Sequence, residues 1–191
     1  MLVMGCGSMA FDQQAFLDAH SRYQGYRDAA FDLTWDQMRK RVPEGCDLRV
    51  MAFDSDALTF WQAIRHFNAV HPQGGFPWDE LYWQIMSTPR RFDVSVWDGT
   101  VLCGLATGMA SRGDENVTLK WVERFNALPN HLGGFVTEVA ITAADHYARV
   151  LGRRKVLIRQ PIAGTEPLYE AFGFTLAPRR LGVVYYERDV A

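Results

Sequence analysis

The sequence predicts an α/β (α+β) protein with a mixed, mostly antiparallel central sheet and helices on both faces. Alternating apolar residues over 91–97, followed by the Asp-Gly turn at 98–99, are typical of an antiparallel hairpin. An apolar stripe at helical spacing runs over 135–151, between strand-like segments at 116–125 and 155–160. Because a crossover helix joins parallel strands, we expect one parallel pair inside the sheet.

Composition favours one globular domain over residues 1–191. Hydrophobic residues make up 48% of the chain and charged residues 22%, which excludes wholesale disorder. The formal net charge is −2, so we expect no nucleic-acid partner, because such proteins carry a basic surface. The three scattered cysteines form no zinc pattern, so we expect no metal and a cytoplasmic location. No apolar run reaches about 18 residues, so no membrane association is expected.

The first 46 residues read as a helical N-terminal extension. Segments 12–21 and 34–42 have the spacing of short helices, and Thr34 is placed to cap the second. The Pro-Glu-Gly run at 43–45 then breaks the chain. We expect the extension to cover a cleft of the following domain or to form an interface.

One strand and two helices follow the extension. The strand is expected over 47–53. Apolar residues at helical spacing predict a helix over 56–70, for which Asp54 and Ser55 offer N-caps. A proline in the first turn favours the next helix, over 77–87.

The second half is expected to be richer in strands. Its segments are strands at 91–97, 100–110 and 116–125, a helix at 135–151, a strand at 155–160, a short helix at 165–172 and one or two strands within 174–188. Gly152 and Gly173 are placed to end the two helices. The apolar run 183–186 is a candidate edge strand that could pair two copies into a homodimer.

A family resemblance rests on this element order and on two local segments. Residues 168–174, Leu-Tyr-Glu-Ala-Phe-Gly-Phe, resemble the LYxxxGF segment of the Gcn5-related N-acetyltransferases (GNAT). The step from helix through Gly152 to strand, over 146–158, is similar to the family as well. The resemblance covers about 47–188, which would be the acyltransferase core, and leaves 1–46 outside. It implies acetyl-CoA as co-substrate and an amine acceptor, either a small molecule or a protein.

The loop before the long helix is the expected pyrophosphate site. In the resembled family a Q/R-x-x-G-x-G/A pattern stands there, and backbone amides at the helix N-terminus hold the phosphates. Here Asn130 takes the Gln/Arg place, Leu132, Gly133 and Gly134 follow, and Phe135 replaces the last small residue. A bulky Phe135 could obstruct the coenzyme. The alternative reading is a glycine turn that merely starts a helix.

The resemblance also implies roles for three residues along the coenzyme. Tyr169 would protonate the leaving thiolate, because a phenol stays protonated at neutral pH and can donate. A backbone amide of the third antiparallel strand, near Val122, would polarise the carbonyl. Thr165 stands where the family commonly has a coenzyme-contacting Asn, and could serve as a cap instead. Tyr169 could equally be a core residue that anchors the short helix.

Glu123 is the candidate general base. On a regular strand it shares the parity of Val117, Leu119 and Trp121, so we expect it on their apolar face. Desolvation there would raise the pKa of its carboxyl towards a useful value. The alternative is a strand-end carboxylate that reaches solvent or pairs with Arg124.

The acceptor is expected near aromatic residues of the first two core helices and their connecting loop. Phe76, Trp78 and Trp83 are the candidates, and the two glycines of loop 71–78 could let it move over a substrate. The resemblance therefore implies transfer of an acetyl group from acetyl-CoA to a primary amine. Its departures from the family pattern leave a second reading open, a GNAT-like module that binds without catalysing.

Overall fold

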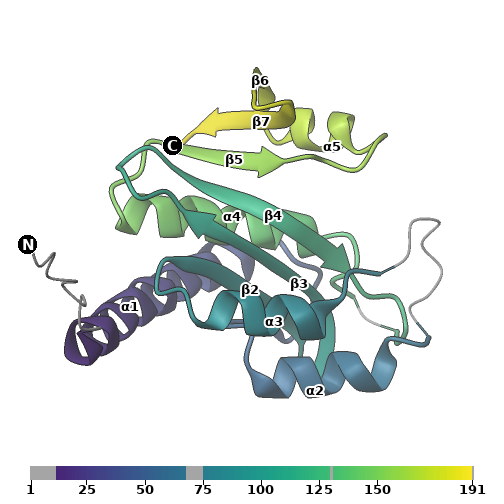
Figure 1. Cartoon of the computed structure of the whole chain (residues 1–191). Helices are drawn as coiled ribbons and strands as arrows, with labels where there is room; N and C mark the ends of the chain where they lie inside the picture. Colours follow the sequence, from purple (N-terminus) through teal and green to yellow (C-terminus); the bar gives the residue numbers. More distant parts are fainter. Residues whose placement is uncertain (1–11, 68–74, 130, 191) are drawn as a thin grey trace, which may run out of the picture.

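The computed structural model describes residues 12–67, 75–129 and 131–190. A seven-stranded sheet with the order β1-β2-β3-β4-β5-β7-β6 forms its centre (Figure 1). The strands are β1 (Leu48–Met51), β2 (Arg91–Asp98), β3 (Val101–Ala110), β4 (Asn116–Arg124), β5 (Lys155–Arg159), β6 (Thr175–Arg180) and β7 (Val183–Asp189). Every pair is antiparallel except β4 with β5, which is parallel. The predicted fold class and the predicted parallel pair are confirmed.

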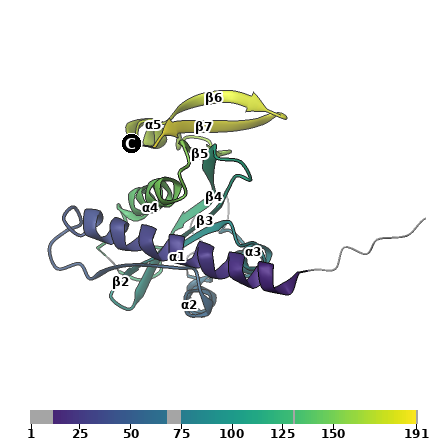
Figure 2. The same cartoon turned by 90° about the vertical axis from the view of Figure 1, so that its left-hand side faces the viewer.

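Helices cover both faces of the sheet (Figures 1 and 2). In the described residues they are α1 (Gln13–Met38), α2 (Ser55–Ile64), α3 (Trp78–Met86), α4 (Val136–Val150) and α5 (Glu166–Ala171). Helices α1 and α4 pack together on one face, and α2 and α3 lie on the other. None of these helices, within the ranges that the structure describes, is long and apolar enough to cross a membrane.

The N-terminal extension forms one long helix, so the prediction of two short helices is wrong. Thr34, the predicted cap, lies inside α1 and its hydroxyl donates to the carbonyl of Ala30 at 2.7 Å. Ala30, Phe31 and Met38 are buried where α1 packs on the rest of the molecule. Tertiary packing thus stabilises a helix whose own periodicity is weak.

A buried charge cluster fixes α1 to the sheet. Arg27 of α1 places its Nε 3.4 Å from Asp93 Oδ1, and Arg91 Nε lies 3.0 Å from the same oxygen. Arg27 and Asp93 are fully buried. The backbone N–H of Phe53 donates to Asp93 Oδ2 at 3.2 Å. Removing one partner would leave a buried charge uncompensated, so the cluster holds α1 in one position.

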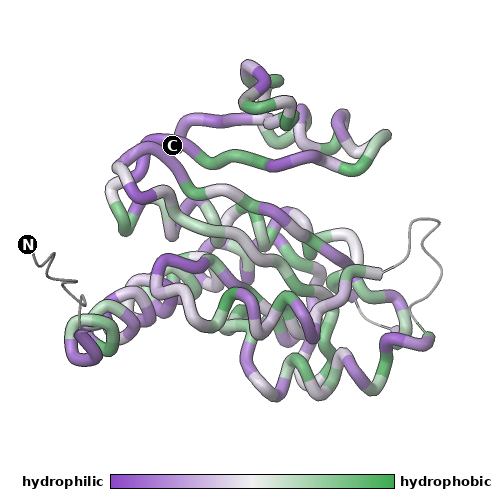
Figure 3. Tube along the Cα trace, viewed as in Figure 1, coloured by the Kyte–Doolittle hydropathy of each residue, from purple (hydrophilic) through white to green (hydrophobic). Residues whose placement is uncertain are grey.

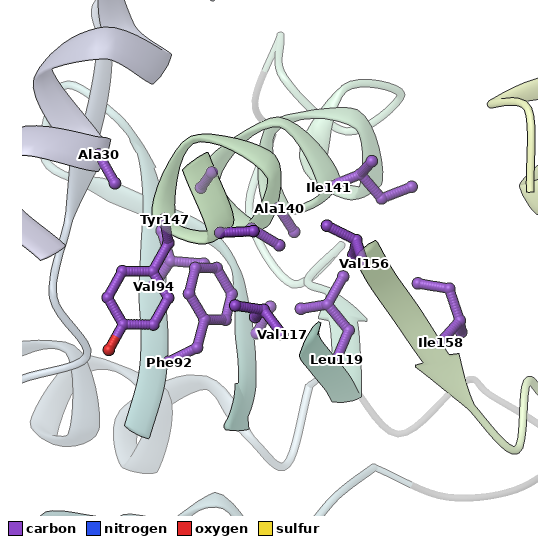
Figure 4. Close-up of a cluster of buried hydrophobic side chains, with 14 of the residues drawn as sticks. Ala30, Phe92, Val94, Val117, Leu119, Ala140, Ile141, Tyr147, Val156 and Ile158 are labelled. Carbon is purple, nitrogen blue, oxygen red and sulfur yellow. The ribbon is translucent and has the colours of Figure 1, made fainter. Parts of the chain in front are cut away.

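The main core lies between the sheet, α1 and α4 (Figure 4). Phe92, Val94, Val117, Leu119 and Val156 point into it from the sheet and meet α4. Helix α2 lies on the opposite face of the sheet. Hydrophilic and hydrophobic residues alternate along it, as expected for a helix with one buried side (Figure 3). A second core under α2 and α3 contains Trp61 and Trp78.

A bulge in β4 reverses the faces of its side chains. Adjacent residues of β3 lie opposite Leu119 and Trp121, so Lys120 has no opposite residue. Val117 and Leu119 consequently face α4, whereas Trp121 packs on the α2–α3 core. Glu123, two residues further, shares the face of Trp121. The prediction that Glu123 lies on the face of Val117 and Leu119 is wrong, because the bulge interrupts the alternation.

The parallel pair separates just after the bulge. Strands β4 and β5 are paired only over 116–119 with 155–158. Beyond that point β4 continues to Arg124, while β5 ends at Arg159, and Figure 1 shows the two strands diverging. Among the residues that the structure describes, no strand pairs with this edge of β4 beyond Leu119.

The final hairpin does not offer the predicted dimer edge. Residues 183–186 belong to β7, which lies between β5 and β6 and is paired on both sides. The free edge of the sheet is β6 instead. The prediction of edge pairing through 183–186 is therefore wrong.

Candidate active site

A small cavity lies where β4 and β5 diverge. Leu119 and Val122 line it from β4, Ile158 from β5 and Tyr169 from α5. Phe76, from the segment before α3, closes another side. Segments that are far apart in the sequence therefore meet at this point. We call this space the splay cavity.

The Val122 amide points towards the open edge of β4. The Phe125 N–H donates to the Cys103 carbonyl of β3 at 2.8 Å. Amides alternate in direction along a strand, so those of Glu123 and Trp121 point to β3 as well. The Val122 N–H points the opposite way, to the side where β5 has left β4. A carbonyl oxygen in the splay cavity could accept its hydrogen bond.

Tyr169 is a buried phenol on the wall of this cavity. Only 8% of the residue is exposed, and its ring packs edge-on against Phe174 with centroids 6.3 Å apart. Gly173 takes a φ of +81°, which lets the chain turn back so that the Phe174 N–H donates to the Tyr169 carbonyl. Burial raises the pKa of Tyr169, so the phenol remains a proton donor at neutral pH.

Glu123 holds the segment before α3 against β4. Its Oε2 accepts the indole N–H of Trp78 at 2.5 Å and the backbone N–H of Phe76 at 3.2 Å. Gly75 passes so close that a Cβ there would lie 3.1 Å from Glu123 Oε1. The half-buried carboxylate thus sits behind Phe76, which lines the splay cavity. Arg124, the alternative partner, instead donates to the Gly133 carbonyl at 3.3 Å.

The three aromatic residues predicted to contact an acceptor have different surroundings. Phe76 lines the splay cavity. Trp78 is fully buried, so the structure places it behind the site as a donor to Glu123. Trp83 is 71% exposed on α3 and packs edge-on against Tyr82. The predicted mobile loop 71–78 lies partly outside the described residues.

The loop before α4 leaves the first amides of the helix without a side-chain cap. Leu132 is fully buried and Gly134 is exposed. Phe135, at the N-cap position, makes no side-chain capping bond, and its ring packs on the core beneath the loop. The ring of Phe135 is only partly buried there, and its predicted obstruction of the coenzyme stays a prediction. The helix dipole and uncapped amides favour an anion here. Asn130 lies outside the described residues.

Asp98 anchors this loop to the β2–β3 turn. Its Oδ2 lies 3.1 Å from both the backbone N and the Nδ1 of His131. Cys46, Asp98 and His131 offer ligand atoms within 4.8 Å of one another, a group that could hold a metal ion. Burial and the Asp98 charge raise the pKa of the Cys46 thiol. The two contacts of Asp98 with His131 hold the loop against the turn.

Thr165 precedes α5 without capping it. Its hydroxyl donates to the Ile162 carbonyl at 2.6 Å, and no side-chain cap is formed. The Gly164 N–H instead donates to Glu166 Oε2 at 2.6 Å. The predicted capping role of Thr165 is wrong, because its side chain turns back to the preceding turn.

Sequence reasoning missed Lys120 and Arg159, which line the splay cavity from β4 and β5. Lys120 is the bulge residue, so a regular alternation misplaces it. Gly108 in β3 was the available signal, since a glycine inside a strand often marks a bulge. A Cβ at Gly108 would lie 2.0 Å from the Thr118 carbonyl oxygen of β4, so the strands approach closely there.

Comparisons with known proteins agree on the architecture. Neither a protein-family model nor a curated protein sequence matches this chain. Among solved structures, an acetyltransferase from Thermus thermophilus has a TM-score of 0.55 at 15% identity, over 74% of this chain and 96% of its own. A protein from Desulfovibrio desulfuricans, described as a member of the GNAT family of acetyltransferases, gives 0.54 at 18% identity, over 77% and 100%.

A third neighbour is nourseothricin acetyltransferase, with a TM-score of 0.53 at 16% identity, over 75% of this chain and 99% of its own. At such identities the likeness concerns the arrangement of the backbone. The sheet order and the diverging parallel pair described above belong to that arrangement. This chain therefore has the fold of the Gcn5-related N-acetyltransferase superfamily.

Proposed function

We propose that this protein transfers an acetyl group from acetyl-CoA to a primary amine of an acceptor. The observation that carries the proposal is the opening between β4 and β5, where the Val122 amide and the Tyr169 phenol border one cavity. The fold shared with acetyltransferases supports the same reaction class. Fold alone would not suffice, so the site residues carry the argument.

The coenzyme is proposed to follow the open edge of β4 to the start of α4. Its pyrophosphate would accept hydrogen bonds from amides of the 130–135 loop, to which Asn130, Leu132, Gly133, Gly134 and Phe135 belong. Thr165, at the start of α5, is proposed to contact the same ligand from the other side of the opening. The uncapped start of α4 and the exposed Gly134 fit a phosphate group. The coenzyme supplies the acetyl thioester.

The proposed chemistry is direct transfer. The acceptor nitrogen attacks the thioester carbonyl carbon, a C–N bond forms and the C–S bond breaks. The Val122 amide would donate to the carbonyl oxygen as its charge develops. Glu123 would take one ammonium proton before the attack, directly or through water. Tyr169 would give its proton to the departing thiolate and would regain one from the acylated nitrogen. Phe76 and Trp83 are proposed to border the acceptor, with Trp78 holding Glu123 in place.

The alternative function is a GNAT-like module that binds without catalysing. The bulky Phe135 at the helix start is one motive for it. Two other departures also motivate it: the Asn that the family commonly has before the short helix is absent, and Asn130 stands in place of the family's Gln or Arg.

Calorimetric titration of the purified protein with acetyl-CoA tests the proposal. We expect micromolar binding, followed by thiol release when primary amines are added. Absence of binding at millimolar acetyl-CoA would contradict acetyl transfer. Binding without thiol release across a wide amine panel would favour the non-catalytic module.

A further inference from the structure

A second cavity, of about 420 Å³, lies beside the splay cavity. Thr118 and Lys120 of β4 and Arg159 of β5 line its floor, together with Tyr185 of β7. These side chains lie on the sheet face away from α4, because Val117 and Leu119 occupy the α4 side. Neither α2 nor α3 contributes a lining residue to this part of the face. We call this cavity the basic groove.

The groove is lined by four basic residues: Arg90, Arg112, Lys120 and Arg159. No acidic residue is among those that line it in the described part of the chain. Two carboxylates of neighbouring segments are engaged elsewhere, since Glu187 pairs with Lys155 at 2.6 Å and Asp114 pairs with Arg153. The whole chain has a formal net charge of −2, so this positive charge is a local concentration.

Arg90 of the groove donates to the Ala110 carbonyl at 2.9 Å, whereas the guanidinium of Arg159 is incompletely compensated. Arg159 Nε is buried and has no hydrogen-bond partner among the described residues. Burial and the nearby Arg159 charge lower the pKa of Lys120. Two facing cations repel each other, and an anion between them would turn this repulsion into attraction. Tyr185 adds a hydroxyl group that can donate to the same anion, whereas the Thr118 hydroxyl donates to Asn116 Oδ1 at 3.1 Å.

The basic groove and the splay cavity are contiguous. Lys120 and Arg159 line both, one from each of the diverging strands. A molecule with its anion in the groove would therefore extend past Lys120 towards the Val122 amide. This arrangement places an anchoring charge on one side of the proposed reaction point and the coenzyme on the other.

We propose that the basic groove binds an anionic group of the acceptor, so that the substrates are primary amines that carry a phosphate or a carboxylate. The inference rests on the proposed acetyl transfer and names its acceptor class. The bonds made and broken are those of that transfer, and the anionic group takes no part in them. Its role is to hold the amine nitrogen near the thioester carbon.

Matched pairs of amines test the acceptor class. Phosphoethanolamine is compared with ethanolamine, and β-alanine with β-alaninamide, so that each pair differs by one anionic group. Binding is measured by calorimetry without acetyl-CoA at low and high salt, and thiol release is measured with acetyl-CoA. We expect the anionic member to bind at least about tenfold more tightly, with the difference shrinking at high salt. The two pairs distinguish a phosphate from a carboxylate specificity.

Charge variants locate the binding site. Arg159→Gln and the exposed Arg112→Gln should each remove most of the preference for the anionic amine. Arg22→Gln is the matched control, because it removes the same charge from an exposed position on α1. The Arg159 variant could fail to fold. The Arg112→Gln variant then still tests the inference, because the Arg112 side chain is exposed.

Each outcome bears on the inference separately from the proposed function. Equal binding of both members of each pair, or a preference that survives both groove variants, would overturn it even if acetyl-CoA binds. Weaker acetyl-CoA binding in the groove variants, with amine binding unchanged, would assign the groove to the coenzyme and overturn it as well. Failure to bind acetyl-CoA, with anionic amines still held in the groove, would instead overturn the proposed acetyl transfer and leave an anion site.

Discussion

Tyr169 lines the splay cavity, whereas Glu123 lies behind Phe76, and the two side chains are held in different ways. Burial keeps Tyr169 protonated, and its position depends on the turn at Gly173. Glu123 is fixed by two donors from the segment before α3. The proposed proton donor and proton acceptor are therefore positioned by separate elements.

Tyr169→Phe should lower kcat of acetyl transfer by about a hundredfold, because it removes the proposed acid. Acetyl-CoA affinity should stay the same, since the ring is retained. Because burial raises the pKa of Tyr169, the rate decline caused by its deprotonation should begin at a higher pH than for an ordinary phenol, whose pKa is about 10. Thiol release measured from pH 7 to about 10 checks both points. Tyr26→Phe on α1 serves as control, and equal rates for both variants would exclude Tyr169 as the acid.

Glu123→Gln and Glu123→Ala separate catalysis from positioning. The Gln amide oxygen can still accept the Trp78 indole N–H, so stability should change little while kcat/KM falls about a hundredfold. The Ala variant leaves the Trp78 donor without this acceptor and should also lose about 1–3 kcal/mol of unfolding free energy. Urea titration and initial rates distinguish the two effects. Full activity in the Gln variant would mean that Glu123 only positions the segment.

At the scale of elements, the β4 bulge controls the shape of the site. It places Trp121 and Glu123 on one face and precedes the point where β4 leaves β5. One feature favours the bulge: Gly108 lets β3 approach β4 closely. The active site thus depends on the register of one strand pair.

Gly108→Ala should destabilise the protein by about 1–3 kcal/mol, because the added methyl would meet the Thr118 carbonyl of β4. The displaced strand should also weaken acetyl-CoA binding. Gly113→Ala is the matched control, since nothing lies within 4 Å of a Cβ there. Urea unfolding and calorimetry give the two readouts. A Gly108 variant as stable as the Gly113 variant would show that the strands can adjust without cost.

At the scale of the whole molecule, we propose that residues 1–191 form one domain in which the extension is part of the structure. Helix α1 packs beside α4, whose first turn is the proposed phosphate site. Its buried Arg27 reaches the carboxylate of Asp93 in the central sheet. The acyltransferase core over 47–188 is therefore expected to depend on α1 for stability.

Arg27→Leu should cost about 3–5 kcal/mol of unfolding free energy, because Asp93 loses one buried partner. The loss should appear as a shift of a single unfolding transition, seen alike by tryptophan fluorescence and circular dichroism. Arg22→Leu, an exposed arginine on the same helix, should change stability by less than about 0.5 kcal/mol. Two separate transitions would instead indicate that the extension folds independently.

Some features followed from the sequence alone because they depend on local chemistry. The Asp-Gly turn at 98–99, the apolar stripe of α4 and the helix stop at Gly152 need only neighbouring residues. Together with the order of elements, they predicted the mixed sheet, its parallel pair and the GNAT resemblance. The two predicted helices within α1 failed because packing against α4 lengthens the helix, which local spacing does not report.

The site itself was decided by contacts between distant segments. The bulge at Lys120 depends on how β3 lies against β4, and it moved Glu123 to another face. The basic groove gathers Arg90, Lys120 and Arg159 from separate parts of the chain. The insertion of β7 between β5 and β6 removed the predicted dimer edge. The alternation of residues in a sequence shows which side chains share a face of the sheet only while the strand is regular. In this protein, tertiary packing decides where the regular strand ends.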